Sequence, residues 1–191
     1  TYVMVHVYVP EAIRRAIRAG VKSIEHGQLI DEPTMKLIAE KGVWLSMQPF
    51  IGEGNNHYTN PVQQAKHELV VQGTDRAYQL AKKYGVKLAW GTDLLFSPAN
   101  ARNQNLNIEK MTRWFSNFEI LKMITHDNAE LLALSGRRNP YPGKLGVIEE
   151  GALADLIVVD GNALEDIKVL TDPGKNMLLI MKDGKIYKND L

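Results

Sequence analysis

The stretch that decides the fold is "AIRRAIRAGVKSIEHG", residues 12–27. In its first half, Ile13 and Ile17 recur at the spacing of one buried helix face. Gly20 follows at the point where a helix end favours a left-handed residue, and an apolar run then leads to His26. The stretch therefore predicts a helix, a tight turn and a strand that ends on a titratable ring.

The same unit occurs twice more along the chain, as "MKLIAEKGVWLSMQ" (residues 35–48) and "AYQLAKKYGVKLAWGTD" (residues 77–93). An earlier apolar run, "YVMVHVYVP" (residues 2–10), supplies one further strand. Helices that alternate with buried strands are typical of an α/β fold with a parallel sheet. We therefore expect four parallel strands with helices between them.

Polar residues recur near the ends of these four predicted strands: His6, His26, Gln48 and Asp93. The C-terminal ends of parallel strands are where the catalytic groups of barrel enzymes gather. Two imidazoles and a carboxylate are a suitable ligand set for Zn²⁺ or a similar cation, and an aspartate there can also transfer a proton. The alternative for each histidine alone is a hydrogen-bonded structural role.

Residues around this predicted centre are candidates for substrate contacts. Tyr8 shares a strand face with His6, and Gln48 ends the third strand. Two long polar loops, residues 49–64 and 94–105, contain the further candidates His57 and Arg102. Loops on this side of a parallel sheet usually shape a substrate pocket, although a solvated surface role is the alternative for both side chains.

Two other titratable residues are expected to be structural. Strand alternation places Glu25 on the side opposite His26, toward the helices. His126, in "THDNAELLALSG", is expected at a helix N-terminus capped by Thr125 or Asp127.

The chain changes character near residue 139, where helical patterns give way to short β-rich runs. The segment "LLIMKDGKIYK", residues 178–188, reads as a hairpin around an Asp-Gly turn. We therefore predict two parts: a barrel-like part over residues 1–136 and a β-rich part over residues 137–191.

Composition restricts the classes of function. The 191 residues carry 23 Lys and Arg against 22 Asp and Glu, a net charge of +1, so no basic excess favours nucleic acid. There are no cysteines, which excludes disulfides and thiolate metal sites. No apolar run is long enough to span a membrane, so we expect no membrane partner, and with no basic excess no nucleic-acid partner; a cytoplasmic location is the expectation.

The segments "HVYVPEAIRRAIRAGVKSIEHG", "GVKLAWGTD", "NAELLAL" and "GVIEEGALADLIVVDGN" together resemble the amidohydrolase superfamily, in particular its imidazolonepropionase-like and Xaa-Pro dipeptidase (prolidase-like) members. The resemblance implies the C-terminal half of a (β/α)8 barrel, strands five to eight, with part of a β-sandwich. It implies that His6, His26 and Asp93 bind a divalent metal, with Zn²⁺ expected and one or two ions in the intact enzyme. Asp93 is then also the general base that moves the proton of the hydrolytic water.

The sequence departs from the family pattern in one respect, because no His-x-His pair occurs in these 191 residues. In the family that pair lies on the first strand, and a lysine often lies on the fourth; strands one to four have no counterpart here. A half-barrel exposes a sheet edge, so we expect association with a second copy or with a missing N-terminal half.

The resemblance implies a small-molecule or dipeptide substrate, and the expected function is hydrolysis of an amide or peptide bond, in a dipeptide or an N-acyl amino acid, by a metal-activated water. Three alternatives stay open: a catalytically incomplete fragment, a cyclic-amide hydrolase or deaminase of the same superfamily, and a binding module whose His and Asp residues are structural.

Overall fold

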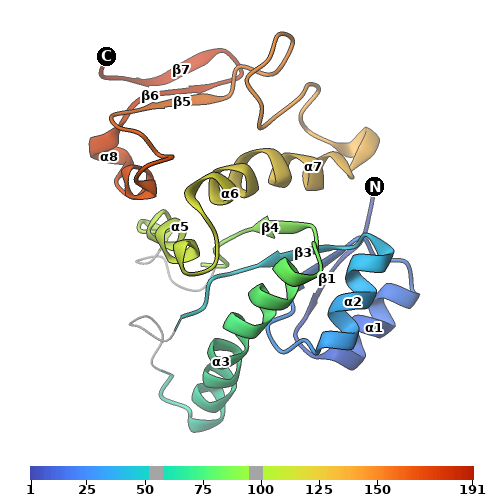
Figure 1. Ribbon diagram of the computed structural model, residues 1–191. Helices are drawn as coiled ribbons and strands as arrows, with labels where there is room; N and C mark the ends of the chain where they lie inside the picture. The colour runs from blue at the N-terminus through green and yellow to red at the C-terminus, as the bar shows by residue number, and fades with distance from the viewer. Residues whose placement is uncertain (52–57, 95–100) are drawn as a thin grey trace. The chain divides into compact units, whose positions relative to one another are not determined.

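The computed structural model describes residues 1–51, 58–94 and 101–191 (Figure 1). These residues form two compact units, Tyr2–Gly91 and Thr92–Leu191, with Thr1 belonging to the second. The division expected after residue 136 remains a prediction. Among the described helices, none is both long and apolar enough to cross a membrane.

The first unit alternates strands and helices, as predicted. Its elements in chain order are β1 (Met4–Val7), α1 (Pro10–Arg18), β2 (Ser23–His26), α2 (Glu32–Lys41), β3 (Trp44–Met47), α3 (Pro61–Lys83) and β4 (Leu88–Trp90). The strands pair in parallel in the order β1-β2-β3-β4, and α1 contacts α2 while α2 contacts α3 (Figure 1). The alternation of strands and helices confirms a mixed α/β fold. In the described residues the sheet is open, and no closed barrel is formed.

The helices begin and end on the residues that the sequence pattern indicates. Proline occupies the first turn of α1, α2 and α3, where a missing backbone N–H is tolerated. Gly42 ends α2 with φ 60°, a left-handed conformation that a residue without Cβ adopts without strain.

The core of the first unit lies where the helices cover the sheet. β3 is buried along its whole length, and β2 at every position except Glu25. Ile13 of α1, Ile24 of β2 and Leu45 of β3 have no solvent-exposed surface. Strands buried in this way are typical of parallel sheets, in which helices cover a face.

Helix α3 approaches the segment after β2 closely at Gly73. A Cβ atom on Gly73 would lie 2.3 Å from the backbone oxygen of Gln28, so only glycine permits this contact. The buried residues of α3 all follow Gly73 in the chain: Thr74, Ala77, Tyr78 and Ala81. The C-terminal part of α3 is therefore the part that packs on the unit.

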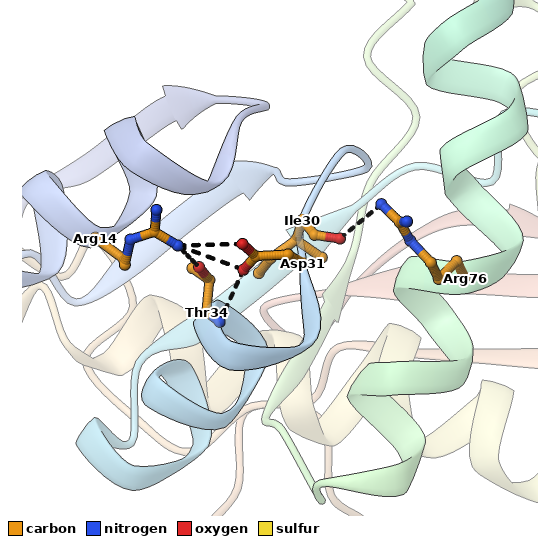
Figure 2. A network of polar contacts seen from close by, with 5 residues as sticks. All are labelled: Arg14, Ile30, Asp31, Thr34 and Arg76. Atoms are coloured by element: carbon orange, nitrogen blue, oxygen red, sulfur yellow. Dashed lines mark hydrogen bonds and ion pairs between the residues drawn. The ribbon is translucent and has the colours of Figure 1, made fainter.

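A polar network joins the three helices of the first unit (Figure 2). Arg14 of α1 donates to both carboxylate oxygens of Asp31, at 3.2 and 3.4 Å, and to Thr34 Oγ1 at 2.6 Å. Asp31 caps α2 by accepting from the backbone N–H of Thr34 at 2.9 Å. Arg76 of α3 donates to the backbone oxygen of Ile30 at 3.0 Å. The segment between β2 and α2 is thus held from both sides.

The carboxyl group of Asp31 has a lowered pKa. Partial burial works in the opposite direction, but the hydrogen bonds from Thr34 and the charge and hydrogen bond of Arg14 outweigh it. The ionised form of Asp31 is therefore the form that the folded unit stabilises.

The second unit is helical at first and then β-rich. Its helices include α5 (Leu106–Lys110), α6 (Asn117–Lys122), α7 (Asn128–Ala133) and α8 (Pro173–Asn176), and its strands are β5 (Leu156–Val159), β6 (Met177–Lys182) and β7 (Lys185–Asn189). The strands form an antiparallel sheet in the order β5-β6-β7. Asp183 and Gly184 join β6 to β7 with φ angles of 50° and 71°, which confirms the predicted Asp-Gly hairpin.

Replacing Asp31 with Ala should lower the free energy of unfolding by about 1 kcal/mol at pH 7, because α2 loses its cap. The pKa of Asp31 is lowered in the folded state, so its ionic contribution is complete above the unfolded-state pKa of about 3.9 and is lost as pH falls through the folded-state pKa. Urea unfolding should show the stability gap between wild type and Asp31→Asn closing at successive pH values below about 4. A gap that stays constant on acidification would contradict this role of the charge.

Candidate functional site

Three aromatic rings meet at the C-terminal ends of β1 and β2. The rings of His6 and His26 have centroids 4.4 Å apart and are tilted by 59°. The ring of Tyr8 stacks on that of His26 at 4.6 Å with an interplanar angle of 16°, and it meets His6 edge-on at 5.3 Å. The structure therefore brings together two predicted metal ligands and one predicted substrate contact.

His26 joins this cluster because its backbone departs from strand geometry. Its register partner in β1 is Val7, whose side chain lies on the opposite face from His6 and Tyr8. The φ angle of His26 is 83°, in the left-handed region, and this turns its ring toward His6 and Tyr8. Non-glycine residues in this region are strained and are concentrated at functional sites.

The expectation that Glu25 faces the helices is wrong. Glu25 is paired with His6 in the β1–β2 register, so its side chain is on the His6 face. The pKa of Tyr2 is raised by burial and by the negative charge of Glu25, which agrees with this placement. Regular alternation stops at His26, and so Glu25 and His26 share a face.

Gln48 follows β3 directly and lies beside His26. Its Oε1 atom is 2.7 Å from Nδ1 of His26, and the two residues are 5% and 4% exposed. The backbone oxygen of Gln48 accepts a hydrogen bond of 3.4 Å from Nε2 of Gln28, a residue with no exposed surface. The predicted contact between Gln48 and substrate remains a prediction.

The other predicted site residues belong to the second unit or lie outside the described residues. Asp93 lies three residues after β4, has φ 53° and belongs to the second compact unit, so its union with the two histidines remains a prediction. Arg102 also belongs to the second unit and is exposed. His57 lies outside the described residues.

A second group of possible cation ligands occurs in the second unit and was not anticipated. Ligand atoms of His126, Asp127 and Glu130 all lie within 4.8 Å of one another. His126 Nδ1 is 2.9 Å from Asp127 Oδ1, and Lys122 forms an ion pair with the same oxygen. The spacing H-D-x-x-E on a helix is the sequence signal that would have indicated this group.

The expected helix N-terminus at His126 is wrong. The segment Met123–Asp127 is a π-helical turn that continues α6 into α7, and neither Thr125 nor Asp127 caps a helix there. A π-helical turn shifts the side chains that follow it around the helix axis, which sequence periodicity does not reveal. The interruption lies within a continuous helical segment.

The comparisons with known proteins agree on one family. Residues 1–187 match the model of the Amidohydrolase family. Ochratoxinase of Aspergillus niger is 33% identical over 190 residues, which cover 97% of this chain and 38% of ochratoxinase. Among solved structures, an amidohydrolase aligns with a TM-score of 0.86 at 36% identity, over 100% of this chain and 45% of its own. A prolidase solved with N-methylphosphonate-L-proline aligns with a TM-score of 0.85 at 34% identity, over 99% of this chain and 45% of its own.

The chain spans less than half the length of these relatives. Across that span the similarity extends through both compact units, since the alignments cover nearly all of this chain. The mixed α/β fold is therefore shared with these relatives.

The left-handed backbone of His26 has a measurable effect on stability. Both His26→Gly and His26→Ala remove the ring, but only glycine adopts φ 83° without strain, so His26→Gly should be the more stable variant by about 0.5–1 kcal/mol. Urea denaturation followed by circular dichroism measures the difference. Ser46 in β3 is the matched control: there the alanine variant should be more stable than the glycine variant. The same order at both positions would contradict the role of the backbone of His26.

Proposed function

This chain belongs to the amidohydrolase family, and from that premise we propose that it is part of a metal-dependent hydrolase that cleaves an amide or peptide C–N bond. The observation that carries the proposal is the pair of imidazole rings, 4.4 Å apart, at the C-terminal ends of two neighbouring parallel strands. A prolidase and an ochratoxinase among its relatives favour a dipeptide or an N-acyl amino acid as substrate.

The residues of the first unit fit a divalent cation as a partial ligand set. Imidazole nitrogens suit Zn²⁺ and other borderline cations, and His6 and His26 offer two of them side by side. We propose Asp93 as the carboxylate ligand that adds to them, with Zn²⁺ as the first candidate and one or two ions in the complete enzyme. A cation bound there would lower the pKa of a water molecule and polarise the carbonyl group of the substrate.

The chain's own residues have separate roles in this proposal. His6 and His26 hold the cation. Asp93 accepts the proton of the attacking water and passes it to the leaving nitrogen of the amide. Tyr8 lies against both imidazoles and is the first candidate for contact with substrate, with Gln48, His57 and Arg102 as further candidates.

The group of His126, Asp127 and Glu130 is the competing cation site in the second unit. Lys122 already neutralises Asp127 there, and a cation would have to displace this ion pair. We therefore place the catalytic cation at His6 and His26.

We further propose that the four parallel strands are strands five to eight of a (β/α)8 barrel and that residues 137–191 belong to a β-sandwich. In the described residues β1 pairs with β2 alone, and Val3 and Met4 at this edge are 61% and 53% exposed. An edge with exposed apolar side chains is a template for further strands. Association with a missing N-terminal half, or with a second copy, would cover it.

Two alternatives share this reasoning. In the first, the chain alone lacks turnover because ligands from further strands are needed, and its length relative to ochratoxinase favours this alternative. The same centre also suits a cyclic amide or a deamination reaction, and a substrate panel separates these reactions.

Metal content and turnover of the complete protein test the proposed centre. His6→Ala and His26→Ala should each lose a stoichiometric divalent metal in elemental analysis, whereas the control Glu130→Gln should retain it. Asp93→Asn should reduce hydrolysis of Xaa-Pro dipeptides and N-acyl amino acids by about 10²–10⁴-fold while the fold is kept. Loss of metal in Glu130→Gln, with retention in His26→Ala, would instead locate the centre in the second unit.

The open edge of β1 should make the 191-residue chain associate. Size-exclusion chromatography with light scattering should give a mass above the 21.5 kDa of one copy. Met4→Lys should reduce that association, since a lysine on an edge strand opposes pairing, and Lys22→Met on the exposed surface is a control. A monodisperse particle of one copy would contradict the proposal of association.

A further inference from the structure

We propose that Gln48 is a positioning residue that holds the proton of His26 on Nδ1 and thereby presents Nε2 as the atom that binds a cation. The inference deepens the proposed function and rests on it only for the cation; the tautomer of His26 is a property of the metal-free protein. It gives Gln48 a role different from the substrate contact that its position at a strand end suggests.

The hydrogen bond between Gln48 and His26 determines the tautomer. With Oε1 of Gln48 facing the ring, the contact of 2.7 Å places a proton on Nδ1 of His26, because an amide oxygen only accepts hydrogen bonds. A neutral imidazole carries a single ring proton, and Nε2 then has the lone pair that a cation needs. Both residues are nearly completely buried, so water does not compete easily for this contact.

Gln48 is itself held in place for this task. It follows β3, which is paired on both sides, with β2 and with β4. Its backbone oxygen accepts from the buried side chain of Gln28, two residues beyond His26. His26 and Gln48 thus lie at the ends of adjacent strands, and their contact does not depend on an exposed loop.

The plane of the His26 ring is fixed by other contacts. Tyr8 stacks on its face at 4.6 Å, and His6 packs against it at 4.4 Å. The left-handed backbone of His26 sets the direction of the side chain. A ring rotated by half a turn would lose the hydrogen bond to Gln48. The hydrogen bond, the ring contacts and the backbone conformation of His26 therefore all favour one orientation of the ring.

Substrate binding through Oε1 of Gln48 would leave a buried ring nitrogen without this partner. Leaving a buried donor unsatisfied is unfavourable, whereas a residue that supports a metal-binding histidine keeps this contact throughout. The opposite orientation of the Gln48 amide would place an NH₂ group on Nδ1 and move the ring proton to Nε2. These possibilities predict different tautomers, which can be measured.

The direct test is nuclear magnetic resonance of metal-free protein with ¹⁵N-labelled histidine, at a pH where the His26 ring is neutral. Two-bond ¹H–¹⁵N correlations report which ring nitrogen carries the proton, and the His26→Asn variant assigns the His26 signals. We expect the Nδ1–H tautomer in the wild type. The Nε2–H tautomer in the wild type would overturn the proposal whether or not any variant folds.

Two substitutions then separate the possible roles of Gln48. Gln48→Glu keeps an acceptor and should keep the Nδ1–H tautomer. Gln48→Met keeps the length of the side chain but removes the acceptor, and it should give a mixture of tautomers. Ser46→Ala, at another buried polar position of β3, is the matched control and should leave the His26 signals unchanged. Unchanged signals from the remaining histidines show that the variants are folded.

Zn²⁺ affinity, measured by competition with a chromophoric chelator, is the second readout. Gln48→Met should weaken binding by about 10–100-fold, and Gln48→Glu should restore it. An unchanged tautomer and unchanged affinity in Gln48→Met, with a raised KM alone, would overturn the proposal and make Gln48 a substrate contact. If the complete wild-type protein binds no divalent cation, the proposed function fails, while the tautomer still decides the role of Gln48.

Discussion

The turn that follows β2 is the constraint on which the first unit depends. Gly27 donates its backbone N–H to the oxygen of Val7 at 2.9 Å, which ties the turn to β1. A Cβ atom on Gly27 would lie 2.8 Å from the Leu45 side chain, and one on Gly73 would meet the oxygen of Gln28. β1, β3 and α3 thus all approach the backbone of this turn closely. Inside this turn His26 adopts the left-handed conformation that brings its ring to the face of His6.

Much of the fold follows from local rules that the sequence displays. Gly42 and the helix-starting prolines mark helix ends because their backbone preferences do not depend on the rest of the chain. The hairpin at Asp183 and Gly184 is predictable for the same reason. The meeting of His6, His26 and Gln48 is also predictable, since the sequence has these polar residues at the ends of successive predicted strands.

The details of the site depend on departures from those rules, and sequence does not display them. Strand alternation assigns Glu25 and His26 to opposite faces, and the single φ angle of His26 reverses that result. The contact between Gln48 and His26 joins residues from neighbouring strands whose side-chain directions are settled only by packing. The π-helical turn that contains His126 has no periodic pattern of its own, and so the sequence alone predicts a helix end there.

Gly73, which lets α3 approach the turn after β2, also separates two parts of the helix that differ in burial. In the part of the chain that the structure describes, the buried residues of α3 all follow Gly73, whereas the residues before it are exposed or half-buried. Glycine within a helix is also unfavourable by about 1 kcal/mol relative to alanine. We therefore expect the first turns of α3 to be less stable than the part that packs on the sheet, and to open locally more often. Limited proteolysis and amide hydrogen exchange should therefore distinguish two segments of α3 with unequal stability, one on each side of Gly73.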